Sequence, residues 1–149
     1  MTKLISFDIK ADFGMLKKPD TNEPVYLTFN MLHKPALLGI LGAIAGLRGF
    51  TKNGEFPEYY ELFKDIKVSI MPLEDEETDK KYHEKGNFSK TIIKYNNGTG
   101  MASEEAGGNL MVAEQTLISP AYRCFVLLDT DIEEQKKLCE NILSYQAEF

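Results

Sequence analysis

The chain has 149 residues, a length that suits one domain and is short for two. Its 43% hydrophobic and 27% charged content is ordinary for a globular protein and excludes collagen-like, wholly disordered and disulfide-scaffold classes. The net charge of -6 argues at first against a nucleic-acid partner, but residues 74–84 and 129–149 carry -4 each. The rest of the surface is therefore close to neutral.

The sequence predicts a soluble cytoplasmic protein. The N-terminal residues lack the basic-then-apolar pattern of a signal peptide. The longest apolar run, Pro35 to Leu47, is about 13 residues long, whereas a membrane helix needs roughly 20. Two cysteines, Cys124 and Cys139, suit a reducing compartment.

The first predicted strand covers Lys3 to Ile9, where apolar and polar side chains alternate. Residues 11–24 contain two prolines and a Pro-Asp pair, which predicts a loop. The short segment Val25 to Phe29 is β-prone.

A glycine-rich helix is predicted to follow from Lys34. Pro35 suits its first turn and Gly49 its end. Gly39, Gly42 and Gly46 lie three and four residues apart, so they share one face, and something must approach that face closely. Two interpretations stand: tight packing on a sheet, or a helix whose first turn accepts a phosphate or a nucleic-acid backbone.

The central part of the chain predicts a short helix over Glu58–Phe63 and a strand over Ile66–Met71. An acidic, solvated loop follows at residues 74–81. Strands over Thr91–Tyr95 and Leu110–Thr116 enclose a glycine-rich segment, which predicts a long β-ribbon with a functional or mobile tip.

The chain ends with its strongest predicted strand, Tyr122–Leu128, and a helix. Asp131 is the expected N-cap of that helix, with Glu134 as its capping-box partner. The order of elements matches an α+β, ferredoxin-like βαββαβ domain over residues 1–149, with a hairpin inserted at about 86–118. The last strand is expected to be missing or reduced to Tyr145–Phe149.

Catalytic motifs are not recognisable in the sequence. His33 and His83 lack neighbours at zinc-ligand spacing, and a Walker loop, a nucleophile elbow and an acid pair are lacking. We therefore expect a binding or assembly protein without metal or cofactor. Metal-free RNA cleavage by His33, Lys81 and Tyr82 is the enzymatic alternative.

Residues 7–14, Thr28 and the segment 34–47 form a pattern at the start of the chain. It resembles the N-terminal signature of the CRISPR-associated protein family five, a subunit of the type I guide-RNA effector Cascade. Residues 86–97 and 114–123 resemble its type I-B branch. The resemblance implies an RNA-recognition-like fold with a β-hairpin thumb at about 86–118. It also implies a non-catalytic role in antiviral defence: binding the 5′ handle of the guide RNA and contacting the backbone and large subunits.

The resemblance and the basic residues together give a set of expected contacts. Charge alone indicates only a solvated surface at the lysines. Lys90 and Lys94 are expected to meet phosphates and Tyr95 to stack on a base. The expected RNA contacts are Lys10, Lys17, Lys18, Lys34, Gly39, Gly42, Lys90, Lys94, Tyr95 and Arg123. The expected partner contacts are Phe13, Asn96, Asn97, Met101 and Met111.

One departure from the family leaves a second interpretation open. Family members continue past this point with further strands, whereas this chain ends at Phe149. A sheet without its last strand exposes an edge that a partner can fill. The alternative is a truncated mimic, an anti-CRISPR protein that competes for Cascade subunits. A third interpretation is an unrelated ferredoxin-like RNA-binding domain.

Overall fold

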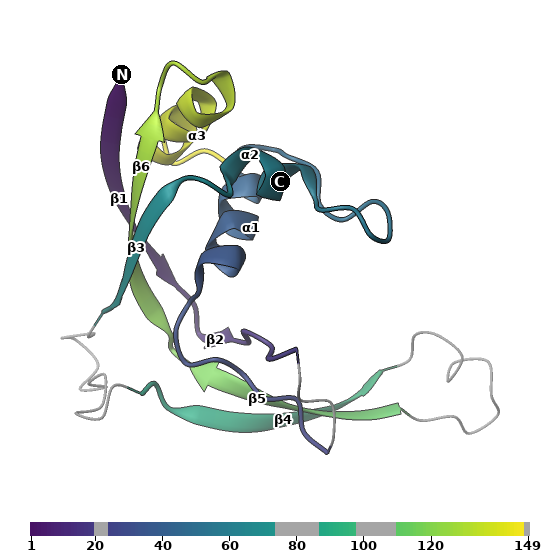
Figure 1. Cartoon of the computed structure of the whole chain (residues 1–149). Helices are drawn as coiled ribbons and strands as arrows, with labels where there is room; N and C mark the ends of the chain where they lie inside the picture. Colours follow the sequence, from purple (N-terminus) through teal and green to yellow (C-terminus); the bar gives the residue numbers. More distant parts are fainter. Residues whose placement is uncertain (20–23, 74–86, 98–109, 148–149) are drawn as a thin grey trace. The chain divides into compact units, whose positions relative to one another are not determined.

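The chain forms an α+β structure, as the sequence predicts, and its described residues form two three-stranded sheets (Figure 1). The computed structural model describes residues 1–19, 24–73, 87–97 and 110–147. One sheet has the strand order β1-β6-β3 and the other β2-β5-β4. No helix in these ranges is long and apolar enough to cross a membrane. The elements are β1 (Thr2–Lys10), β2 (Phe13–Gly14), α1 (Lys34–Ile44), α2 (Glu58–Phe63), β3 (Lys67–Pro72), β4 (Lys90–Asn97), β5 (Leu110–Ile118), β6 (Ala121–Asp129) and α3 (Glu133–Leu143).

The chain divides into two compact units. The first combines residues 1–9, 32–73 and 122–149, and the second combines residues 10–31 and 74–121. The division arises because the loop after β1 folds onto the β4–β5 hairpin, so this hairpin has packing partners of its own. The single domain over residues 1–149 stays a prediction.

The first unit has a sheet with all three helices on one face (Figure 1). Strand β3 pairs antiparallel with β6, with Ser69 opposite Phe125. Alternate residues of β6, namely Cys124, Val126 and Leu128, are fully buried. This period-two pattern places one face of the strand in the core, as the alternation in its sequence predicts.

Helix α1 ends earlier than the sequence predicts. Gly46 has φ of 71°. Its N–H donates to the carbonyl of Ala43, and the N–H of Leu47 donates to the carbonyl of Gly42. This pair of bonds is a Schellman motif, in which a glycine in the left-handed conformation ends the helix. The prediction of Gly49 as the helix end, with Gly46 inside the helix, is therefore wrong.

The glycine face of α1 lies against α2. A Cβ atom added at Gly42 would lie 2.4 Å from the Cβ of Tyr59, and one at Gly39 would lie 3.7 Å from the Tyr59 hydroxyl. Gly42 is buried. Close packing thus explains this face, and its partner is a tyrosine of a helix rather than a sheet. Because Tyr59 covers the buried Gly42, this glycine is not accessible to RNA, contrary to the predicted RNA contact there.

The start of α3 also differs from the prediction. Its N-cap is Ile132, without a side-chain cap bond. Asp131 instead accepts a hydrogen bond from the amino terminus of Met1 and donates its backbone N–H to Asp129. The Asp131 carboxylate therefore bonds to the N-terminal amino group and does not cap α3. Residues 145–147 form no strand, and 148–149 lie outside the described residues.

The second unit is built on the antiparallel β4–β5 pair, in which Thr91 lies opposite Thr116. Strand β2 pairs with the end of β5, and the backbone of Tyr26 bonds to Ala113 and Gln115 further along the same strand. The β-prone segment 25–29 forms isolated bridges, through Tyr26 and Thr28. Buried Thr28 accepts a hydrogen bond from the Leu16 backbone N–H and donates one to the Phe29 carbonyl.

We expect the free energy of unfolding to decrease at alkaline pH because the thiol of Cys124 is buried. Burial, with a smaller contribution from Asp8, raises the pKa of this thiol to about 11. The thiol ionises at a lower pH in the unfolded chain than in the folded protein. Its contribution to the free energy of unfolding is therefore complete below about pH 8.5 and is lost as the pH rises towards 11. The expected loss is on the order of 1 kcal/mol at pH 10.

Urea unfolding at pH 8, 9 and 10 measures this effect in the wild type and in Cys124→Ala. The substitution lowers stability at every pH because it leaves a cavity. The diagnostic quantity is the slope with pH, which we expect to be flatter in Cys124→Ala. Equal slopes in the two proteins would show that this thiol does not titrate differently on folding.

Candidate nucleic-acid interface

Strand β4 carries two predicted RNA-binding lysines on one face. Lys90 and Lys94 are four positions apart on the strand, so they share a face with Ile92. Ile92 is 54% exposed, and the Lys90 ammonium donates to the Asn30 amide oxygen at 3.2 Å. Lys94 is exposed and has no ion pair within the residues that the structure describes. This face therefore offers cations beside an accessible apolar side chain.

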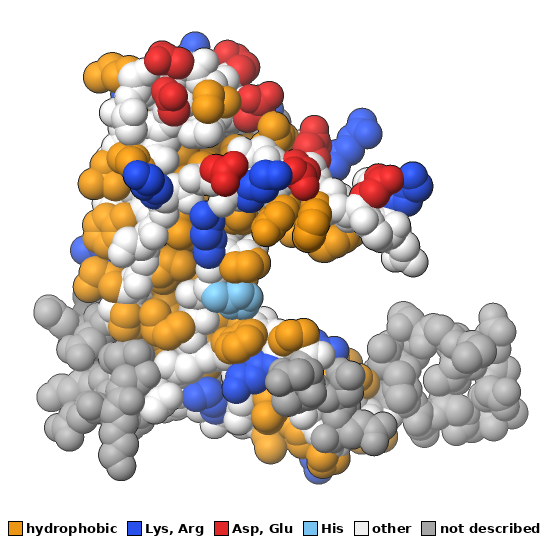
Figure 2. Space-filling view, viewed as in Figure 1, with side chains coloured by type: hydrophobic (Ala, Val, Ile, Leu, Met, Phe, Trp, Pro, Cys, Tyr) orange, Lys and Arg blue, Asp and Glu red, His pale blue; other side chains and the backbone are white. Residues whose placement is uncertain are grey.

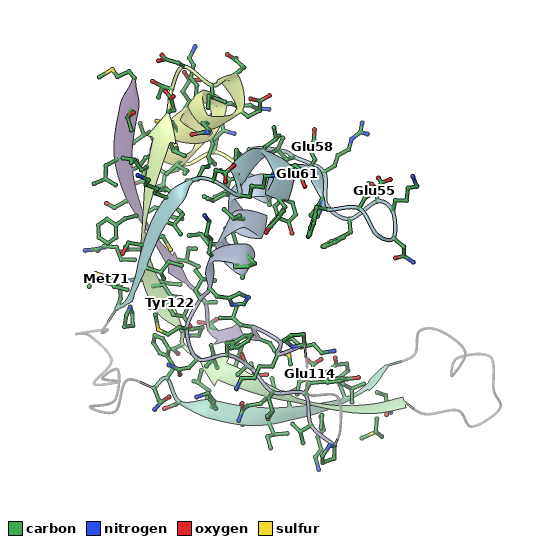
Figure 3. The ribbon with its side chains drawn as sticks, in the orientation of Figure 1. Glu55, Glu58, Glu61, Met71, Glu114 and Tyr122 are labelled. Carbon is green, nitrogen blue, oxygen red and sulfur yellow. The ribbon has the colours of Figure 1, made fainter. Side chains whose placement is uncertain are left out.

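Tyr95 lies on the opposite face of β4. Its register partner is Val112, whereas that of Lys94 is Ala113. The Tyr95 hydroxyl donates to Glu114 at 2.8 Å, and this hydrogen bond raises the pKa of the phenol. Figure 3 shows Glu114 on the β-ribbon. Tyr95 therefore lies on the opposite face of β4 from Lys90 and Lys94, although the three residues were predicted to contact RNA together.

Lys17 and Lys18 lie on the loop that folds onto β5. The Lys17 ammonium is 3.8 Å from the centre of the Tyr26 ring, and that of Lys18 is 5.5 Å from the centre of the Phe29 ring. Cation–π contacts of this kind hold the ammonium groups beside partly exposed aromatic rings. Sequence patterns alone do not single out Tyr26, Phe29 or Asn30. The β-prone pattern of residues 25–29 was the available signal, but it does not reveal the pairing with Lys17 and Lys18.

The described strands and loops of the second unit are basic. They contain five lysines (Lys10, Lys17, Lys18, Lys90 and Lys94) against two carboxylates (Asp12 and Glu114). The sequence of segments 20–23, 74–86 and 98–109 adds a charge of -7 to the same unit. The described lysines of this unit therefore lie on its strands and the loop paired with them. Figure 2 shows lysines among hydrophobic side chains there.

Lys10, one of these five lysines, is exposed at the end of β1. The remaining predicted RNA contacts belong to the first unit. The Lys34 ammonium donates to the Lys64 carbonyl at 2.6 Å and so links α1 to the end of α2. Arg123 on β6 forms two bonds to Asp8, at 2.7 and 2.9 Å. Gly39 contacts Tyr59 at ordinary distance.

Three of the predicted partner contacts lie on the surface of the second unit. Phe13 on β2 is 58% exposed, and Met111 on β5 is 62% exposed. Asn96 lies opposite Met111 in the hairpin. The side chain of Asn97 and all of Met101 lie outside the described residues, as do Lys81, Tyr82 and His83 of the enzymatic alternative.

The first unit has a cavity of about 580 Å³ beside β1. Its lining includes Ser6 and Asp8 of β1, Ile44 of α1 and Asn141 of α3. The Asn141 amide donates to the Ile44 carbonyl at 2.9 Å and joins the two helices. Strand β1 is an edge strand of the sheet formed by the described residues. This edge has the hydrogen-bonding groups that an additional strand requires.

Within the described residues, no group of three or more His, Cys, Asp or Glu side chains is placed to hold a metal ion. No protein-family model matches the sequence, and no curated protein matches it significantly.

Proposed function

We propose that this chain is a non-catalytic, RNA-binding assembly protein of the family-five type in type I-B Cascade. It binds the 5′ handle of the guide RNA and contacts the backbone and large subunits. The observation that carries the proposal is the grouping of five lysines with exposed aromatic and aliphatic side chains on the paired strands and loops of the second unit. Cations that neutralise phosphates beside apolar surfaces for bases are the usual means of binding single-stranded RNA.

The topology of the first unit supports a ferredoxin-like origin for this protein. In a βαββαβ sheet, the third strand lies between the first and the second. Strand β6 lies between β1 and β3, with α1 after β1 and α3 after β6. Along the sequence, the β4–β5 hairpin lies between β3 and β6, the second and third strands of this pattern. This is the position at which the resemblance implies a thumb.

Replacing Lys90 and Lys94 by glutamine tests the RNA-binding role. We expect weaker binding and a slope of log affinity against log salt that is about 1.4 smaller, because each phosphate contact on a single strand contributes about 0.7. Fluorescence anisotropy measures the affinity, with a labelled RNA carrying the repeat-derived 5′ segment of a type I-B guide.

The matched control is the double variant Lys136→Gln and Lys137→Gln. It removes the same charge from exposed positions of α3 in the first unit. We expect this variant to keep the wild-type salt slope. If both double variants change the slope equally, the effect is one of net charge and the assignment of phosphate contacts to β4 is wrong.

Co-purification tests the assembly role. The tagged protein is expressed in cells that carry a type I-B Cascade, and the recovered proteins and RNA are identified. We expect guide RNA together with the backbone and large subunits. Recovery of one Cascade subunit without guide RNA, together with loss of intact Cascade, would instead identify the chain as an inhibitory mimic.

A further inference from the structure

The sheet of the first unit has a second face that the helices do not cover. Because Cys124, Val126 and Leu128 enter the core, the intervening residues Phe125 and Leu127 point to the opposite side. Register partners share a face, so Ser69 lies beside Phe125. Figure 3 shows Met71 of β3 on the side of the sheet away from the helices.

Two contacts place β1 in register on the other side of β6. The Arg123 guanidinium bonds to Asp8, and the Thr130 N–H donates to the Met1 carbonyl. Both contacts fit one antiparallel register, in which Ser6 lies beside Phe125. The Phe125 ring is thus flanked by a serine on each neighbouring strand, Ser6 and Ser69, and both serines are exposed.

We propose that Phe125 is a stacking platform for a base of single-stranded RNA. This inference rests on the proposed function and assigns a base-binding position within it. Phe125 is half-buried, and its neighbours on both adjoining strands are short, exposed serines. Their hydroxyl groups both donate and accept hydrogen bonds, as the edge of a base requires. The same face also carries Leu127 and exposed Met71, so the ring lies on a sheet face that combines hydroxyl groups with apolar surface, on which a planar base can stack.

The cations near the ring suit the phosphates of an RNA strand. Lys67 lies opposite Leu127, next along β6 on the same face, is exposed, and has no ion pair within the described part of the chain. Arg123 is 45% exposed and retains accessible surface beside its Asp8 partner. These cations flank the ring along the strand direction, where the backbone of a stacked strand would run. A base–aromatic stack contributes about 1–3 kcal/mol.

A tryptophan at position 125 tests the stack directly, because the sequence contains no tryptophan. The variant Phe125→Trp has a single indole whose fluorescence a stacked base quenches. We expect quenching that saturates with the same affinity that anisotropy gives for the single-stranded RNA. The control is Phe50→Trp, at a residue that is 76% exposed in the first unit. Its fluorescence should stay unchanged.

A second pair of variants measures the energetic contribution. We expect Phe125→Ala to weaken RNA binding by about 5- to 150-fold and Phe125→Tyr to restore most of the affinity, since tyrosine keeps the ring. Circular dichroism confirms that both variants are folded. RNA that binds with normal affinity to Phe125→Ala, or without quenching at position 125, overturns the platform and leaves the proposed function intact. Absence of RNA binding by the wild-type protein overturns both.

Discussion

Gly42→Ala should lower the free energy of unfolding by about 1–3 kcal/mol. The new methyl group would lie 2.4 Å from the Cβ of Tyr59 and 2.7 Å from its Cγ. Neither atom is the end of a flexible side chain, so α1 and α2 have to move apart. The higher helix propensity of alanine, roughly 1 kcal/mol, opposes this effect and does not cancel it. Urea unfolding followed by circular dichroism measures the change.

Gly39→Ala is the matched control, one turn earlier on the same helix. Its added methyl group would lie 3.7 Å from the Tyr59 hydroxyl, an ordinary contact. We expect equal or greater stability, by up to about 1 kcal/mol, from the better helix propensity. If the two variants lose stability equally, the close approach of Tyr59 to Gly42 is not the cause.

Phe63→Ala should have the largest effect on stability, about 3–5 kcal/mol. Phe63 is fully buried at the end of α2. A helix of six residues is too short to be stable by itself, so α2 depends on its packing. Loss of the ring leaves a cavity and releases the helix that positions Tyr59 over α1. The expected change is a large part of the 5–15 kcal/mol that stabilise a typical domain.

Leu62→Ala separates this effect from a general weakening of α2. Leu62 is the preceding residue and is 38% exposed. We expect a loss below about 1 kcal/mol, because little apolar surface leaves the core. The loss in free energy of unfolding, measured by thermal and urea unfolding, should be several-fold larger in Phe63→Ala than in Leu62→Ala. Similar losses would mean that the ring of Phe63 does not anchor the helix.

The two proposed RNA-contacting surfaces differ in chemistry and can be tested separately. The lysines of the second unit act through charge, so their removal changes the salt dependence of binding. Phe125 acts through stacking, so its removal changes affinity with little effect on the salt slope.

Local sequence patterns determined the positions of most elements. The periodic apolar residues of Tyr122–Leu128 and the short segment Glu58–Phe63 led to correct predictions of β6 and α2. These patterns succeed because one residue out of two, or out of three to four, must face a core. Pro35 likewise marked the first turn of α1 because its fixed φ suits that position.

Tertiary structure decided which residues meet. The spacing of Gly39 and Gly42 predicts a close neighbour, but only the packed fold identifies it as Tyr59. The pairing of strands separates Tyr95 from Lys94 and brings Lys17 to Tyr26, because register and loop placement depend on residues far apart in the chain. Asp131 fits the pattern of an N-cap, yet the nearby amino terminus of Met1 competes for its carboxylate. Sequence periodicity thus determined the local elements and their buried faces, whereas long-range packing determined the surface on which each functional group lies.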